Sequence, residues 1–216
     1  MGIMVQRFWL SVFASVLAVC GWTGAVQAHP HVWVSMKTEI LYGPDGTMTG
    51  LKQDWTFAEA FTAFALQGLE RNADGTYPDS VLKPLAEVNI TSLKEYDYFV
   101  KGKTAAAKMT FVDPTSYSLT YANDTLTLHF ILPLAQPIPA KGSMTFDIYD
   151  PTYFVSFDFA EEGPVALVNA PKGCTVQVIT PDVPDTMQLG ESFFTNLTSS
   201  STFGSQYADK ISVKCP

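Results

Sequence analysis

The strongest constraint on the fold is a series of short segments in which apolar and polar residues alternate. Val32, Val34 and Met36 follow each other at every second position, a period typical of a half-buried strand. Similar segments, rich in threonine, aromatic and β-branched residues, recur between clusters of Gly, Pro, Asn and Asp. Short strands separated by turn residues predict a β-sandwich. The predicted strands cover residues 32–40, 51–57, 108–112, 116–121, 125–132, 143–149, 153–159, 174–179 and 210–215.

The hydrophobic period changes between the second and third predicted strands. Phenylalanines three and four residues apart mark the apolar face of a helix over residues 58–69. A second helical pattern covers residues 79–96, where Pro84 either kinks the helix or starts it anew. We therefore expect a mainly β (α+β) fold, a β-sandwich-like domain with a helical insertion at about residues 58–97.

The first 28 residues have the pattern of a secretory signal peptide. Arg7 precedes the apolar run 8–20, and Ala28 ends a plausible cleavage site. We expect cleavage after Ala28, which leaves residues 29–216 as a single exported domain. The alternative is an uncleaved N-terminal anchor, although the apolar run is short for a membrane span.

Charge and cysteine content narrow the class of protein. The net charge of −8 argues against a nucleic-acid partner. Cys174 and Cys215 remain after signal cleavage, and two cysteines in an exported chain most simply form one disulfide. A metal–thiolate site is the weaker alternative, because neither cysteine has CxxC or CxxH spacing.

Two of the three histidines, His29 and His31, stand at the start of the mature chain. Residues i and i+2 of a strand point to the same face, so the two imidazoles should project together. Neutral imidazoles bind Zn²⁺, Ni²⁺, Co²⁺ and Cu²⁺, and signal cleavage would add the new α-amino group as a ligand. The alternative is a pair of exposed terminal histidines that bind nothing.

Pro30 limits which chelate can form. It has no amide hydrogen, so a square-planar copper or nickel site that uses deprotonated backbone amides is blocked. A histidine brace stays open, in which the amine and ring of His29 are joined by a second imidazole from His31 or His129. His129 alone is more typical of an ordinary strand residue on the polar face.

A second candidate site lies between the two predicted helices. Glu70, Asn72 and Asp74 stand at positions 1, 3 and 5 of a loop with glycine at position 6, as in the first half of a calcium-binding EF-hand loop. Position 12 is Val81 rather than the bidentate Glu. We therefore expect a degenerate loop with weak or no calcium binding, stabilised by Asn, Asp and Gly as an ordinary turn.

Two further carboxylates lie beside aromatic residues. Glu59 falls in the first turn of the first predicted helix, where it suits the helix dipole, and Asp150 precedes a proline at a strand end. Either could complete a two-histidine metal site. No Gly-rich phosphate loop, GxSxG or HExxH motif accompanies them.

Several of these segments together resemble the DUF1007 family. The similarity rests on the start His29–Val34, on Trp55–Phe57 with Glu59, on Tyr149–Phe154 and on the late cysteine pair. The family's members are exported bacterial proteins labelled as periplasmic components of an ABC-type transport system, often found with nickel/cobalt-type transporters. The resemblance implies that this chain handles a transition metal in the periplasm.

The chain departs from the family pattern at two points. Ala58 stands where the family has Asp before Glu59, and the loop from Glu70 lacks its closing Glu, which argues against calcium. We expect a periplasmic Ni, Co, Zn or Cu-binding accessory or substrate-binding component of an inner-membrane metal transporter, and no enzyme. The alternatives are a copper histidine-brace redox enzyme and a periplasmic adaptor domain that binds no metal.

Overall fold

The structure is a computed structural model that describes residues 29–182 and 191–216. The expected signal peptide, residues 1–28, lies outside these ranges. Within them, no helix is both long enough and apolar enough to cross a membrane.

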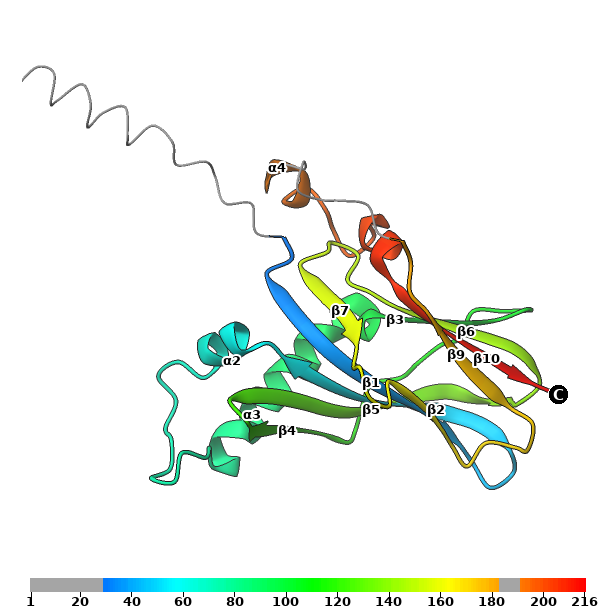
Figure 1. The fold of residues 1–216 in the computed structure, drawn as a ribbon, viewed down its shortest axis with the longest axis horizontal. Coiled ribbons are helices and arrows are strands. Elements are labelled where there is room, and N and C mark those ends of the chain that lie inside the picture. The colour runs from blue at the N-terminus through cyan, green and yellow to red at the C-terminus, as the bar shows by residue number, and fades with distance from the viewer. Residues whose placement is uncertain (1–28, 183–190) are drawn as a thin grey trace, which may run out of the picture.

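The described residues contain ten strands, which form two sheets (Figure 1). The first sheet, sheet A, has the order β4-β5-β2-β1-β7. Strand β8 also pairs with β1, further along the same edge that β7 occupies. The second, sheet B, has the order β3-β6-β10-β9. The strands are β1 (Val32–Tyr42), β2 (Thr47–Phe57), β3 (Val100–Thr104), β4 (Tyr117–Ala122), β5 (Thr125–Pro139), β6 (Gly142–Ile148), β7 (Val155–Phe159), β8 (Val165–Val168), β9 (Thr175–Ile179) and β10 (Asp209–Cys215).

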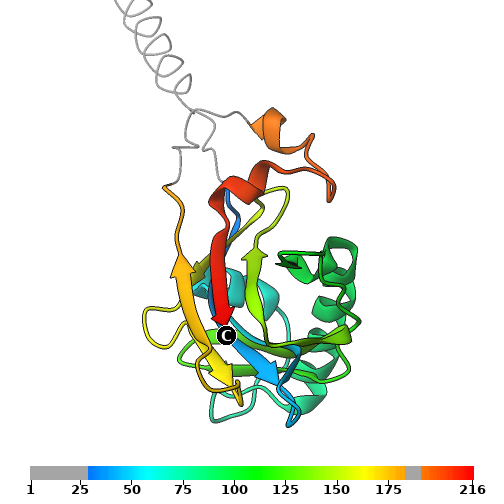
Figure 2. The same ribbon diagram turned by 90° about the vertical axis from the view of Figure 1, so that its right-hand side faces the viewer.

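Helices occupy the segment between β2 and β3 and the segment before β10. Figure 2 shows the first group beside the sheets and the second group at the end of the molecule where β1 begins. The helices are α2 (Glu59–Ala65), α3 (Asp79–Leu93), the 3-10 helix η1 (Lys94–Phe99), α4 (Glu191–Phe194) and the 3-10 helix η2 (Phe203–Tyr207).

The core lies between the two sheets. Inward side chains alternate with outward ones along each strand, so both sheets present one apolar face. Trp55 from β2, Phe130 from β5 and Phe146 from β6 are each at most 2% exposed and belong to one cluster. Leu82 and Ile90 of α3 extend this cluster beside β4. The expected β-sandwich with a helical insertion is therefore confirmed.

The insertion differs from expectation in detail. The first helix ends at Ala65 rather than at residue 69. The second is a single α-helix that contains Pro84 without interruption and passes into η1 after Leu93. Pro84 is the sixth residue of this helix, so its missing N–H leaves the carbonyl of Ser80 without the usual helical partner.

Three strand assignments also differ. The expected strand 108–112 forms only isolated bridges, from Lys108 to Lys103 and from Phe111 to Leu134. This segment crosses from sheet B to sheet A and cannot pair along its length with either. Strands β3 and β8 were not predicted, because the Lys- and Gly-containing β3 and the four-residue β8 lack a clear alternating pattern.

A disulfide joins Cys174 to Cys215, as expected, across a sequence separation of 41. Cys174 precedes β9 and Cys215 ends β10, which pair antiparallel. The bond therefore ties the end of the chain to the edge strand of sheet B.

Removing this disulfide should destabilise the protein. Closing a loop of this size lowers the conformational entropy of the unfolded chain, worth about 3–4 kcal/mol in the chain-entropy model. We expect the Cys174→Ser, Cys215→Ser double variant to lose this amount in urea unfolding monitored by tryptophan fluorescence. Reduced wild-type protein serves as the control and should match the variant; equal stability of oxidised wild type and variant would contradict the expectation.

Three consecutive non-glycine residues, Asp97, Tyr98 and Phe99, adopt left-handed backbone conformations with φ of 51°, 54° and 56°. Side chains disfavour this region by roughly 1–2 kcal/mol per residue, so the turn needs support from its surroundings. The buried Tyr98 hydroxyl donates a hydrogen bond to Asp113 Oδ1 at 2.9 Å. Burial, and then this hydrogen bond, raise the pKa of Tyr98 to about 12.

This raised pKa predicts a loss of stability at high pH. Below pH ~10, the usual tyrosine pKa, Tyr98 is protonated in both states and its contribution is fully present. Between that pH and about 12 the unfolded tyrosine ionises first, so the free energy of unfolding falls. We expect Tyr98→Phe to flatten this fall, measured by urea unfolding at several pH values; an unchanged slope would count against the assignment.

Candidate functional site

His29 and His31 lie next to each other at the start of β1. Their ring centroids are 4.5 Å apart with the rings close to perpendicular, at 73°. Phe194 of α4 stacks on the His29 ring at 4.0 Å, and Phe154 lies 4.8 Å from the His31 ring. Both imidazoles therefore project to the same side, as the sequence predicted.

The two imidazoles line an open groove of about 490 Å³. Its other walls come from three segments far apart in the sequence: the η1 turn, the residues that lead into β7, and α4 with the residues after it. Aromatic and small polar side chains predominate. The lining residues are His29, His31, Tyr96, Phe99, Asp150, Thr152, Phe154, Val155, Phe194, Thr195 and Leu197.

Asp150 holds one wall of this groove in place. Its carboxylate is 3% exposed and accepts four hydrogen bonds. Oδ1 accepts from the backbone N–H and hydroxyl of Thr152 at 2.7 and 2.8 Å, and Oδ2 accepts from the N–H groups of Phe154 and Val155 at 3.1 and 3.0 Å. A carboxylate has about four lone-pair positions, so all of them are used inside the loop.

The loop held by Asp150 in turn fixes the position of His31. The Phe154 carbonyl accepts hydrogen bonds from the N–H groups of His31 and Val32 at 2.9 and 3.1 Å. From this point β1 and β7 pair in parallel, with Val32 opposite Val155. Asp150 therefore acts as a positioning residue for the histidine pair, whereas the sequence suggested it as a ligand.

Gly204 of η2 packs directly behind Asp150. A Cβ at this position would lie 1.7 Å from the Asp150 carbonyl oxygen, so no larger residue fits without moving the loop. The Gly204 N–H also donates to the Pro151 carbonyl at 3.2 Å. The segment before β10 thus supports the groove from behind.

The site places two imidazole rings side by side rather than a complete set of metal ligands. Within residues 29–182 and 191–216, no three His, Cys, Asp or Glu side chains are grouped as metal ligands. Transition metals bound by imidazole usually have four or more ligands. An ion held by His29 and His31 would therefore keep positions open to the groove.

His129 does not join this site. It lies in β5 on the outer face of sheet A, where Asp54 and Ser118 are its cross-strand neighbours. Its Nδ1 is 2.6 Å from Asp54 Oδ1 and its Nε2 is 2.8 Å from Thr120 Oγ1. Both ring nitrogens of His129 therefore have protein partners. Of the two imidazoles considered for a brace, only His31 lies beside His29.

Glu59 is also placed elsewhere. It begins α2, as expected, and lines a different hollow together with Trp33 and Asp158. The structure therefore brings together His29, His31 and Asp150 from the predicted site residues, and leaves Glu59 and His129 outside.

The loop containing Glu70, Asn72 and Asp74 is closed by its own hydrogen bonds. Asp74 Oδ1 accepts from the N–H and hydroxyl of Thr76 at 3.0 and 2.7 Å, and these bonds lower the Asp74 pKa. Asn72 Nδ2 donates to the same hydroxyl at 2.9 Å. This is the hydrogen bonding of an Asx turn between helices, the kind of turn that the sequence predicted at this position.

A family model described as "Protein of unknown function (DUF1007)" matches residues 14–215. This chain belongs to the DUF1007 family. An uncharacterised protein of Haemophilus influenzae is 24% identical over 193 residues, covering 88% of this chain and 92% of that protein. An uncharacterised 15.5 kDa protein of Spirochaeta aurantia is 31% identical over 96 residues, covering 44% of this chain and 69% of that protein.

Among solved structures, acetylcholine-binding protein type 1 of Biomphalaria glabrata is similar with a TM-score of 0.38 and 10% sequence identity, over 90% of this chain and 91% of that one. A similar protein from Bulinus truncatus has a TM-score of 0.35 and 9% identity.

Sequence reasoning missed the aromatic walls of the groove. Phe154 belongs to a segment singled out for its family resemblance, yet its contact with His31 needs the β1–β7 pairing. Phe194 lies in a Ser- and Thr-rich stretch, and no local pattern links it to His29. Tyr96 and Phe99 reach the groove only because of the left-handed turn.

Replacing Asp150 tests its positioning role. In Asp150→Asn one carboxylate oxygen becomes an NH₂ group, which cannot accept from buried N–H groups, and we expect a loss of about 2–4 kcal/mol. Asp45→Asn is a matched control, because exposed Asp45 Oδ1 accepts the same two bonds from Thr47 at 3.1 and 2.8 Å. Urea unfolding should show a far smaller loss for the control; equal losses would contradict the role.

Proposed function

We propose that this protein binds a transition-metal ion reversibly through His29 and His31 in the periplasm, as an accessory or substrate-binding component of an inner-membrane metal transporter. The observation that carries the proposal is the 4.5 Å separation of the two imidazole rings at the edge of an open groove. The nickel/cobalt transporter association implied by the family resemblance supplies the biological setting. Nickel, cobalt, zinc and copper are the candidate ions.

The anchoring of β1 supports this use of the histidines. A metal site at a free chain end would normally lose affinity because the end must be ordered on binding. Here the His31 N–H is already bonded to the Phe154 carbonyl, and that loop is held by the buried Asp150. The chain end therefore loses most of its conformational entropy when the protein folds, and little more is lost when the metal binds.

The incompleteness of the ligand set favours a carrier. Two imidazoles leave several coordination positions for water, for the α-amino group released by cleavage after Ala28, or for a ligand from a receiving protein. Exchange of metal between proteins needs such open positions. A structural site, by contrast, is usually closed by four protein ligands.

Export is part of the same proposal. The Cys174–Cys215 disulfide is of the kind that persists in oxidising compartments such as the periplasm. The expected signal peptide provides the route. Cleavage before His29 would then both release the domain and add the α-amino group to the two imidazoles as a third ligand.

Metal titration of the mature protein tests the proposal. We expect calorimetry and native mass spectrometry to show one Ni²⁺, Co²⁺, Zn²⁺ or Cu²⁺ per chain, with at least tenfold weaker binding in His29→Ala, His31→Ala. His129→Ala is the matched control, since it removes an imidazole outside the groove and should retain binding. An extension of two alanines before His29 measures the contribution of the amine.

Three outcomes would overturn the proposal. If wild-type protein binds none of the four ions, the alternative of a periplasmic adaptor domain is favoured instead. Equal loss in the His129→Ala control would place the metal elsewhere. Tight copper binding combined with turnover of oxygen or peroxide would instead support a redox enzyme with a His29–His31 brace.

A further inference from the structure

The outer face of sheet B carries a concentration of positive charge on an acidic protein. Inward residues of β3, β6 and β10 belong to the core, so the alternate residues face outward. Five of the outward side chains on this face are lysines, whereas Asp147 is its acidic residue among those that the structure describes. The lysines are Lys101, Lys103, Lys108, Lys210 and Lys214.

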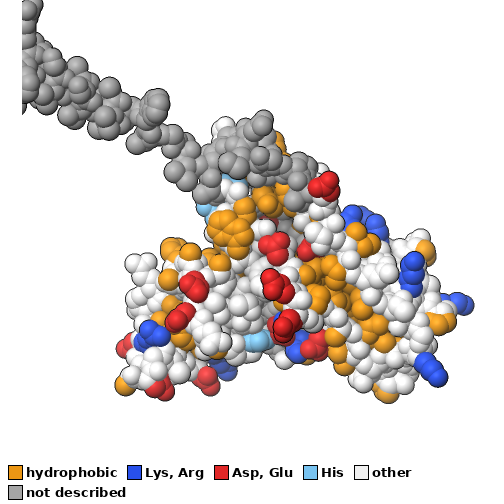
Figure 3. Space-filling model, viewed as in Figure 1, with side chains coloured by type: hydrophobic (Ala, Val, Ile, Leu, Met, Phe, Trp, Pro, Cys, Tyr) orange, Lys and Arg blue, Asp and Glu red, His pale blue; other side chains and the backbone are white. Residues whose placement is uncertain are grey.

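This face contrasts with the whole chain, whose net charge is −8. Figure 3 shows basic side chains gathered at the end of the molecule that contains sheet B, and acidic side chains over the centre and the opposite end. A separation of charge of this kind orients and accelerates the approach of an oppositely charged partner.

Two lysines on this face repel each other. Lys103 lies directly opposite Lys108 in an antiparallel bridge, and like charges directly opposite are destabilising. Lys101 has an ion pair with Asp97, and Lys210 lies 4.0 Å from Asp147. Within the described ranges, by contrast, no carboxylate lies within ion-pair distance of Lys103 or Lys108.

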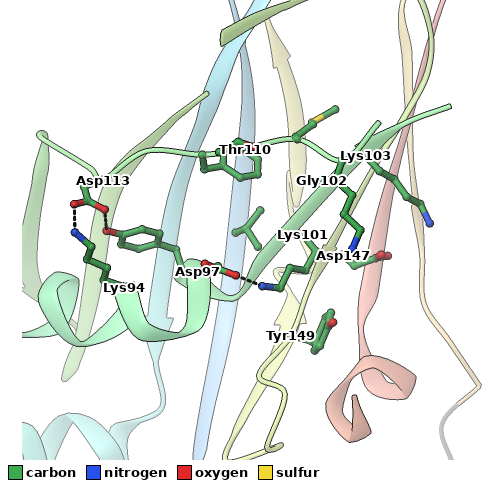
Figure 4. A pocket seen from close by; sticks show the side chains of 14 residues that line it. Lys94, Asp97, Lys101, Gly102, Lys103, Thr110, Asp113, Asp147 and Tyr149 are labelled. Carbon is green, nitrogen blue, oxygen red and sulfur yellow. Dashed lines mark hydrogen bonds and ion pairs between the residues drawn. The ribbon is translucent and has the colours of Figure 1, made fainter. Parts of the chain in front are cut away.

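A groove of about 660 Å³ adjoins these lysines. In Figure 4 the Lys94–Asp113 ion pair lies at one end and Lys103 at the other. Apolar surface between them comes from Tyr98, Val100, Met109, Phe111 and Tyr149. The groove therefore combines unneutralised cations with an apolar floor.

The floor depends on two backbone features. Gly102 lets the 108–112 segment approach β3, since a Cβ there would lie 2.8 Å from Met109 Sδ, and Met109 N–H donates to the Gly102 carbonyl at 2.8 Å. The left-handed turn at Asp97 and Tyr98 brings both side chains to the groove. Sterically unfavourable backbone of this kind concentrates at functional sites.

We propose that the outer face of sheet B and this groove form a docking surface for an acidic, extended segment of a partner protein. Carboxylates of the segment bind Lys103 and Lys108, and an apolar side chain between them enters the groove. The bound carboxylates offset the repulsion between the two lysines. This surface shares no lining residue with the histidine groove, so the inference is independent of metal binding.

Charge and shape together select a peptide rather than another anion. A nucleic acid or an anionic bilayer presents a large negative surface, which the overall charge of −8 repels. A bilayer is also too flat to fill a concave groove. The carboxylates that line the groove, Asp97, Asp113 and Asp147, are paired with Lys101, Lys94 and Lys210, which leaves Lys103 and Lys108 for the ligand. A short acidic segment meets the lysines and avoids the rest of the protein.

Fluorescence polarisation with a labelled twelve-residue peptide tests this inference. The probe alternates Glu and Ala around one central Phe; a second probe has Gln in place of Glu, and a third has Ala in place of Phe. We expect wild-type protein to bind the first probe with an affinity that falls as salt is raised, and to bind the other two at least tenfold more weakly.

Charge-reversal variants locate the binding. Lys103→Glu, Lys108→Glu should weaken binding of the first probe by about tenfold or more. Lys37→Glu, Lys83→Glu has the same change in net charge at two exposed positions outside this surface and should bind like wild type. Circular dichroism and thermal unfolding verify that both variants are folded.

Three results would overturn the inference. Equal weakening in both double variants would mean that overall charge, not this surface, attracts the probe. Absence of binding at low salt would exclude an acidic segment as the ligand. Cosedimentation with phosphatidylglycerol vesicles that depends on Lys103 and Lys108, with no peptide binding, would assign the surface to a membrane instead.

Discussion

The fold depends on the burial of one apolar face from each sheet against the other. Trp55 lies at the centre of this contact, 1% exposed, with ring neighbours Phe130 from sheet A at 4.9 Å and Phe99 from the left-handed turn at 6.4 Å. Its indole N–H donates to Gln53 Oε1 at 3.2 Å, so burial leaves the indole with a partner. Because each fully buried large side chain contributes about 1.5–3 kcal/mol, this shared core sets the separation of the sheets.

The position of β1 in this core explains why a chain end can carry an ordered site. β1 pairs with β2 on one side and with β7 and β8 on the other. A central strand cannot move without breaking both ladders, so the residue before it, His31, inherits a defined position. The buried Asp150 then fixes the neighbouring loop, and two histidines that would otherwise be terminal become part of a groove wall.

The histidine groove and the groove beside sheet B lie on either side of the η1 turn. Tyr96 and Phe99 line the histidine groove, whereas Asp97 and Tyr98 line the groove beside sheet B. The left-handed backbone from Asp97 to Phe99 places the neighbouring side chains of residues 97 and 98 in one groove and those of residues 96 and 99 in the other. A metal-carrying protein with a separate docking surface could hold its partner while the metal site remains free to exchange its ligand.

Much of the fold could be predicted from the sequence, because strand and helix periods are local properties of the chain. The alternation at Val32–Met36, the phenylalanine spacing of the first helix and the cysteine pair all led to features that the structure contains. Local patterns failed for β3, for β8 and for the 108–112 segment, where the decisive factor is which sheet edge is available for pairing. The same limit applies to the turn at 97–99, since Asp97 is a residue type that tolerates a left-handed backbone but Tyr98 and Phe99 are not.

For the site, the sequence by itself determined the identity and spacing of two imidazoles on one face of a strand. Only the tertiary structure decided what surrounds them. Parallel pairing of β1 with β7 brings Asp150 and Phe154 to the histidines across more than a hundred residues, and the packing of Gly204 behind that loop brings α4 and Phe194 over the ring of His29. The same long-range pairing leaves His129 and Glu59 on other surfaces. Strand pairing, and not closeness along the chain, decides where each residue lies in the fold.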